Sequence, residues 1–301
     1  YNNTTGEKNT AIGYHSMYAN TTGEYNAAIG TDSLRANTTG QQNVALGHNS
    51  LYSNTAGFGQ VAAGYKSLFN NTTGNYNVAL GAYNLECNTT GSCNVAIGYQ
   101  TLQCNVTGGY NTAIGYRVLT NNTTNTNVGV GFCVLHANTT GSGNVGVGTS
   151  VLRCNTTGCG NVAIGMESSV MNTSGQRNVA VGSGSLQNNT IGKNNVAIGF
   201  NNMRQGTHAD CNIAIGSYSL YQTQGDYNLG MGVNTLSSND SGSYNIAFGM
   251  QSLTSNTTAC YNIGIGFQSL YANTTGQYSV GIGYKTLYSN TTGEHNIGTV
   301  S

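Results

Sequence analysis

The sequence contains no proline, no tryptophan and very little charge. Charged residues make up 6% of its 301 residues, against about 25% in ordinary globular proteins. The nine basic and nine acidic residues balance, so no net field attracts nucleic acid or an anionic membrane surface. The chain also lacks a run of the roughly 20 apolar residues that cross a bilayer. We therefore expect no nucleic-acid partner and no membrane span.

Sequence patterns typical of metal-binding, phosphate-binding or catalytic sites are also missing. Acidic residues do not recur at a fixed spacing, which excludes calcium-binding repeats. The cysteines form no C-x-x-C pair of a zinc site, and the G-x-G at Gly129–Gly131 has no following helix to form a phosphate loop. We interpret the cluster of His208, Asp210 and Cys211 as a tolerated irregular turn. The sequence predicts no catalytic residue, no metal and no cofactor.

A short repeat occupies the whole chain. The pattern N-T-T-G-x-x-N-V-A-I-G-x-x-S-L-x-x occurs eighteen times, first from Asn3 and last from Asn290, and only the copies opening at Asn122 and Gly206 shorten to sixteen residues. We number its positions 1 to 17 from the asparagine of N-T-T-G. A fixed short period is typical of solenoids and fibrous arrays. It predicts one continuous repeat domain over residues 1–301, and because neither end resembles a cap, a segment of a longer fibre.

Alternation within each copy has the period of a β-strand. Seventeen residues are too few for a strand plus a helix, so the sequence predicts an all-β fold, a parallel β-solenoid (β-roll) of about eighteen 17-residue coils. In the copy 37–53 we expect Val44 and Leu46 (positions 8 and 10) and Leu51 (position 15) to point inward. Ala45 and Gly47 (positions 9 and 11) would then form a bare outer face, set by tight coil geometry or by close approach of another copy.

Asparagine and threonine dominate the rest of the copy. The asparagine at position 7 is predicted to form a hydrogen-bonded amide ladder between coils. N-T-T-G has the chemistry of a turn, and fourteen copies carry an N-x-[ST] glycosylation sequon at position 1. On an exposed turn of a secreted protein each sequon asparagine would accept an N-linked glycan. The alternative is that Asn-Thr is present only because it forms the turn, and that the sequon is incidental. The candidate acceptors are Asn3, Asn20, Asn37, Asn71, Asn88, Asn105, Asn122, Asn138, Asn155, Asn172, Asn239, Asn256, Asn273 and Asn290.

Eight cysteines recur at a few places in the repeat. The pairs Cys87 with Cys93 and Cys154 with Cys159 bracket an N-T-T-G turn, which makes bridges across the turn feasible. Cys87 and Cys104 share position 17 of successive copies, about one strand spacing apart, so the group can pair in more than one way. Disulfides would indicate an oxidising extracellular setting; the alternative is buried free thiols.

Two regular columns have competing interpretations. Threonines at positions 2 and 3 form hydroxyl arrays of the kind that an ice-binding solenoid needs, but adjacent residues point to opposite sides and run into a turn glycine. Tyrosines at positions 6, 12 and 16 are interpreted as stacking between coils rather than as a carbohydrate site.

The run N-V-A-I-G-x-x-S, present with small variations at 43–50, 94–101 and 262–269, resembles the head repeats of YadA-like trimeric autotransporter adhesins. It is also similar to the N-T-T-G repeat tracts of phage and giant-virus tail-fibre-like proteins. The resemblance covers essentially the whole chain. It implies a left-handed parallel β-roll, commonly three chains wide, used for reach and attachment without catalysis.

Together these features predict an extracellular structural protein that is not an enzyme. It would form the shaft of a fibre or filament, carry glycans and associate laterally or end to end with copies of itself. The alternatives are an adhesin or viral tail-fibre segment and, more distantly, an ice-binding solenoid.

Overall fold

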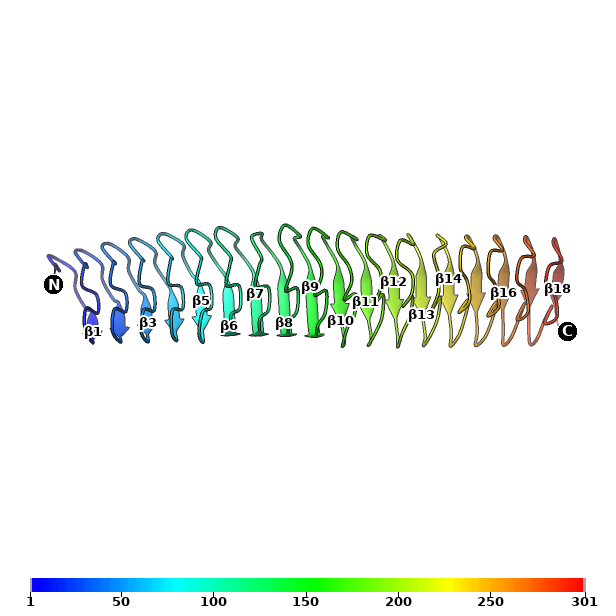
Figure 1. The fold of residues 1–301 in the computed structure, drawn as a ribbon, viewed down its shortest axis with the longest axis horizontal. Coiled ribbons are helices and arrows are strands. Elements are labelled where there is room, and N and C mark those ends of the chain that lie inside the picture. The colour runs from blue at the N-terminus through cyan, green and yellow to red at the C-terminus, as the bar shows by residue number, and fades with distance from the viewer. Residues whose placement is uncertain (1, 300–301) are drawn as a thin grey trace. The chain divides into compact units, whose positions relative to one another are not determined.

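The computed structural model describes residues 2–299 and divides into two compact units, residues 1–147 and 148–301. Each unit is a row of coils with one short parallel strand per coil, and no helix occurs in the described residues (Figure 1). This confirms the predicted all-β, parallel β-solenoid fold. That the repeat makes one continuous domain stays a prediction.

The strands occupy positions 8 to 10 and in four coils extend to position 12. In the first unit they are β1 (Thr10–Ile12), β2 (Ala27–Ile29), β3 (Val44–Leu46), β4 (Val61–Ala63), β5 (Val78–Leu80), β6 (Val95–Tyr99), β7 (Thr112–Tyr116) and β8 (Val128–Phe132). Strand β9 (Val145–Thr149) includes the point of division. In the second unit they are β10 (Val162–Ile164), β11 (Val179–Val181), β12 (Val196–Ile198), β13 (Ile213–Ile215), β14 (Leu229–Met231), β15 (Ile246–Phe248), β16 (Ile263–Ile265), β17 (Val280–Ile282) and β18 (Ile297–Thr299).

Successive strands pair in register, so that like positions stand above one another. Ala45 of β3 lies opposite Ala28 of β2 and Ala62 of β4. Where a copy has sixteen residues the register still holds, since Thr112 pairs with Val128 and Ile213 with Leu229. Every column of side chains in the repeat therefore becomes a physical column within a unit.

The face of the strand that points into the coil is the opposite of the one predicted. Ala45 is fully buried, Val44 is half-buried and Leu46 is 40% exposed. The same order holds from β2 to β17: position 9 is buried and position 10 is half-buried or exposed. The predicted inward positions 8 and 10 and the predicted bare outer face were therefore wrong, whereas the inward leucine at position 15, such as Leu51, is confirmed.

The narrowness of the coil explains this inversion. Position 9 faces the position-15 leucine and a buried serine or threonine at position 14, such as Ser50, whose Oγ donates to the carbonyl of Gly47 at 3.0 Å. The space beside position 9 is limited. Position 9 is glycine at Gly129, where a Cβ would lie 2.5 Å from Cγ1 of the position-14 residue Val118. Only small side chains fit at position 9, so the branched residues at positions 8 and 10 face outward.

Three places in each coil bend the backbone into the left-handed region. In the coil that begins at Asn37 they are Gln42 (φ 57°), Asn49 (φ 59°) and Leu51 (φ 50°), at positions 6, 13 and 15. L-residues resist this conformation, and β-branched ones resist it most. Among the described non-glycine residues with positive φ, Thr126 alone is β-branched. The sequence thus avoids Val, Ile and Thr at the bends.

This avoidance gives a testable expectation at the exposed residue Gln42. Gln42→Val should lower the free energy of unfolding by about 1 kcal/mol, because a β-branched side chain resists the left-handed region more than the unbranched glutamine that already occupies it. Gln42→Gly should be near neutral, since relief of that strain offsets an entropy cost of about 0.5–1 kcal/mol. Urea denaturation followed by circular dichroism measures both. Equal midpoints for the two variants would contradict the assigned bend.

Candidate functional site

The N-T-T-G corner is hydrogen-bonded to the next coil and is not an isolated turn. In the coil that begins at Asn37, the backbone N–H groups of Thr38, Thr39 and Gly40 all donate to the carbonyl of Thr55 in the next coil, at 3.0, 3.1 and 3.2 Å. The Thr38 hydroxyl donates to the same oxygen at 3.0 Å. The corner therefore ties each coil to its successor.

Asparagine at position 1 lies inside this corner and forms a ladder of its own. Nδ2 of Asn71 donates to Oδ1 of Asn54 at 2.9 Å and to the carbonyl of Gly74 at 3.2 Å, and Oδ1 of Asn71 accepts from Asn88 at 2.8 Å. Asn71 is fully buried. The sequence analysis did not identify this second amide ladder.

The sequon asparagines are accordingly not on exposed turns. Twelve of the fourteen are at most 2% exposed: Asn20, Asn37, Asn71, Asn88, Asn105, Asn122, Asn138, Asn155, Asn172, Asn239, Asn256 and Asn273. Asn3 is exposed and Asn290 is half-buried. A glycan on Nδ2 replaces one of its two protons and needs solvent around it, so it is incompatible with the buried ladder. The expected sugar-bearing edge is therefore corrected: the folded coils bury these twelve acceptors.

The predicted position-7 ladder is confirmed, and it meets the first ladder at the turn glycine. Oδ1 of Asn26 accepts from the backbone N–H of Asn43 at 3.0 Å, and Nδ2 of Asn43 donates to the carbonyl of Gly57 at 2.9 Å. The same carbonyl accepts from Asn54 at 3.0 Å. A Cβ on Gly57 would lie 2.4 Å from Oδ1 of Asn54, which favours glycine where the two ladders join. Alanine takes this place at Ala259, whose carbonyl still accepts from both ladders.

The threonine columns differ in their availability. Position-2 hydroxyls donate to carbonyls of the next coil, as Thr21 does to Thr38 and Thr72 to Thr89, at 3.0 and 3.1 Å. Position-3 threonines such as Thr39 are exposed. A single column of outward hydroxyls remains, which weakens the ice-binding alternative because one of its two arrays is already engaged within the fold.

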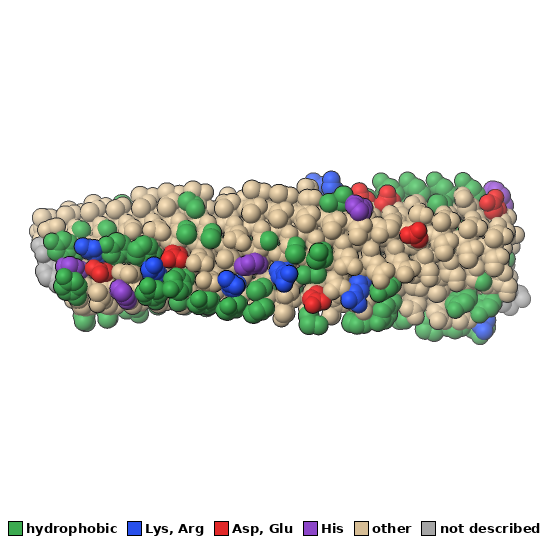
Figure 2. All heavy atoms as spheres, viewed as in Figure 1, with side chains coloured by type: hydrophobic (Ala, Val, Ile, Leu, Met, Phe, Trp, Pro, Cys, Tyr) green, Lys and Arg blue, Asp and Glu red, His purple; other side chains and the backbone are tan. Residues whose placement is uncertain are grey.

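The outer strand face is apolar in both units. Figure 2 shows hydrophobic side chains gathered in patches along the molecule, with Lys, Arg, Asp, Glu and His side chains lying between several of them. In the first unit its exposed residues at positions 10 and 12 include Ile29, Leu46, Tyr65, Tyr99, Tyr116 and Phe132. In the second unit they include Ile164, Met166, Ile198, Phe200, Phe248, Met250, Ile265, Ile282 and Tyr284. We call this surface the strand face.

Aromatic rings stack between coils, as predicted. At position 6, Tyr227, Tyr244, Tyr261, Tyr278 and His295 form one stack, with successive centroids 5.0–5.2 Å apart and planes within 6°. At position 12, Tyr99 and Tyr116 stack at 5.5 Å. Because neighbours cover the ring faces inside each stack, mainly ring edges remain for other molecules.

The cysteines do not form the predicted bridges in this structure. Cys87, Cys93, Cys104 and Cys154 carry free thiols, and Sγ of Cys159 donates to the carbonyl of Thr157 at 3.3 Å. Burial, followed by the neighbouring Cys104 and Glu86, raises the pKa of the Cys87 thiol. Disulfide formation stays a prediction.

The irregular coil near His208 is explained by backbone contacts. The Asp210 carboxylate accepts from the backbone N–H of Lys193 at 2.6 Å, and His208 contacts the hydroxyl of Thr207. Between residues 2 and 299 no group of three or more His, Cys, Asp or Glu side chains is placed to hold a metal ion. Asp210 thus holds an atypical turn together.

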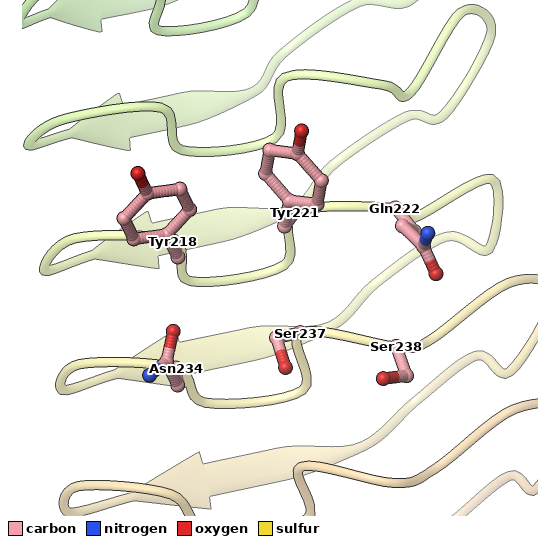
Figure 3. A pocket seen from close by; sticks show the side chains of 6 residues that line it. All are labelled: Tyr218, Tyr221, Gln222, Asn234, Ser237 and Ser238. Atoms are coloured by element: carbon pink, nitrogen blue, oxygen red, sulfur yellow. The ribbon is translucent and has the colours of Figure 1, made fainter.

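A shallow hollow lies on the surface of the second unit. Its volume of about 240 Å³ is below the roughly 300–1,000 Å³ usual for ligand pockets. Figure 3 shows tyrosines on one coil and small polar side chains on the next. The lining residues are Tyr218, Tyr221, Gln222, Asn234, Ser237 and Ser238. The hollow forms because a coil with large side chains is stacked next to a coil with small ones. Its lining residues do not form a cluster of reactive groups.

Comparison with known proteins assigns no family. No family model matches the chain, and no curated protein matches it. In the part of the chain that the structure describes, no helix is long and apolar enough to cross a membrane.

Proposed function

We propose that this protein is a non-enzymatic structural element of an extracellular fibre or filament, which assembles with copies of itself through the strand face. The observation that carries the proposal is the orientation of the strand. In most coils the strand keeps a small residue inside at position 9 and presents a larger side chain outside at position 10, as Ala45 and Leu46 do. The extracellular setting rests on the resemblance of the repeats to adhesin and tail-fibre sequences.

The chemistry of the strand face supports association rather than solvation. A monomeric soluble protein rarely exposes a contiguous apolar patch larger than a few hundred Å², whereas here exposed apolar residues recur along both units. Ile29, Leu46, Ile164 and Ile198 are each about 40% exposed at position 10. With charge at only 6% of residues, little on the surface opposes contact between chains.

The period of the repeat supports a second copy as the partner. Parallel strands stand about 4.8 Å apart, so position-10 side chains form rows with the same spacing on every molecule. Two such rows can interdigitate along their length when the two sheets pack face to face about 10 Å apart. An unrelated surface would match this spacing at few points.

Paired substitutions test the proposal. The double variant Ile164→Thr with Ile198→Thr removes apolar groups from the strand face. Its matched control, Val106→Thr with Ile191→Thr, alters N-T-T-G corner residues of similar exposure, 41% and 44% against 41% and 39% on the face. Each buried methyl or methylene group contributes about 0.8 kcal/mol, so we expect the face variant to associate at least tenfold more weakly.

Sedimentation velocity and electron microscopy read out the result. The wild type and the corner variant should form filaments or bundles over the same concentration range, and the face variant should remain in smaller species. Isolated compact particles of wild type at all concentrations would refute self-assembly. Equal assembly of the two double variants would refute the role of the strand face.

A further inference from the structure

Cys87 and Cys104 occupy the same place in two successive coils of the first unit. Each is the last residue of its repeat copy, and like positions of these coils are hydrogen-bonded in sequence. The N–H of Cys87 donates to the carbonyl of Gln103 at 3.0 Å, and that of Leu85 donates to Thr101 at 3.1 Å. The backbones around the two cysteines therefore run side by side in register.

This placement satisfies the Cα separation of a disulfide. Neighbouring parallel strands lie about 4.8 Å apart, and disulfide-bonded cysteines have Cα atoms about 4.4–6.8 Å apart. Both side chains leave the coil on the same side, because the two residues hold the same position in coils that are stacked in register. Residues at like positions of stacked coils are related by translation, so their Cβ atoms are also about 4.8 Å apart, slightly more than the roughly 3.5–4.5 Å of a disulfide. Formation of an S–S bond therefore needs side-chain rotation and a small approach of the two backbones.

We propose that Cys87 and Cys104 are a reversible redox pair, whose disulfide clamps two successive coils together. The reaction is thiol–disulfide exchange with a small disulfide such as oxidised glutathione. The more exposed Cys104 attacks as a thiolate and releases one glutathione thiol. The Cys87 thiolate then attacks the mixed disulfide and releases the second, so two protein thiols are oxidised and one glutathione disulfide is reduced to two thiols.

The local environment sets the pH dependence of the second step. The pKa of Cys87 lies above its ordinary value because the thiol is partly buried and Cys104 and Glu86 are close. The thiolate is the nucleophile, so closure of the disulfide should accelerate as pH rises toward that pKa. The clamp would stabilise the fold mainly by restricting the unfolded chain across one coil. This inference does not depend on self-association.

Cys154 provides a matched control within the chain. It also occupies the last position of its copy, but the equivalent residues of the preceding and following copies are Ala137 and Met171. Its thiol therefore has no cysteine at the equivalent place in an adjacent copy. We expect Cys154 to remain alkylatable, or to stop at a mixed disulfide, under conditions that close the Cys87–Cys104 bond.

The experiment uses the full chain incubated with oxidised glutathione, then alkylation and peptide mass spectrometry. The expected product is a peptide pair joined through Cys87 and Cys104, reversed by dithiothreitol, with melting raised by a few degrees in the wild type. Cys104→Ser should lose both the linked pair and the melting shift. Linkage of Cys87 to Cys93, or full alkylation of Cys87 and Cys104 after oxidation, would overturn the proposal. The wild-type linkage map alone decides it if the variant fails to fold.

Discussion

Replacement of Ala45 by leucine is expected to lower the free energy of unfolding by about 3 kcal/mol, at the upper end of the usual cost of overpacking a core. Ala45 is fully buried, and the coils on either side place Ala28 and Ala62 directly beside it. The position-15 leucine of the same coil, Leu51, is also fully buried. Three additional carbons have no space unless the coil opens. Urea denaturation monitored by circular dichroism measures the loss.

The adjacent residue supplies the control for this substitution. Leu46→Thr places a smaller, polar, strand-compatible side chain at a position that is 40% exposed, and should cost less than about 1 kcal/mol in dilute solution. The sequence-based orientation, with Leu46 inside and Ala45 outside, predicts the reverse order. If Leu46→Thr destabilised the protein more than Ala45→Leu did, the orientation of the strand would be refuted.

Asn71→Asp is expected to cost about 3 kcal/mol or more. The substitution removes the two N–H groups that donate to Oδ1 of Asn54 and to the carbonyl of Gly74. It then places a carboxylate beside these two acceptors in a fully buried site. Losing one partner of a buried hydrogen bond costs about 1–3 kcal/mol, and more when a charge is involved. The midpoint of thermal unfolding should therefore fall clearly.

A second asparagine in the same coil isolates the effect of burial. Asn75 is half-buried at position 5, where its Oδ1 accepts from the N–H of Phe58 at 3.0 Å. A carboxylate can accept that hydrogen bond equally well, so Asn75→Asp should be near neutral. Similar losses for the two variants would show that added charge, rather than the ladder, causes the destabilisation.

The fold class was predictable from the repeat, but the orientation of its strand was not. The two-residue period of a strand indicates that Val44 and Leu46 share one face and that Ala45 points to the other. It does not say which face is inside. Hydrophobicity favours the larger residues, whereas the width of a 17-residue coil admits only the smaller one.

The candidate site was predictable only in part. The position-7 ladder follows from a column of asparagines, but the position-1 column was interpreted through its sequons. Asn54 and Asn189 are followed by Thr-Ala and Thr-Ile, so the asparagine persists where the sequon is lost. Both are buried and donate within the ladder, Asn54 to Asn37 at 2.9 Å and Asn189 to Asn172 at 3.2 Å. The requirement for a buried amide explains their presence.

An image of the native assembly at side-chain resolution would test most directly whether the strand face joins copies of the chain. The account predicts a second copy packed on this face, with its own position-10 and position-12 side chains against residues such as Leu46 and Ile198. An assembly whose strand faces stay in solvent, and whose chains meet through the N-T-T-G corners instead, would contradict it.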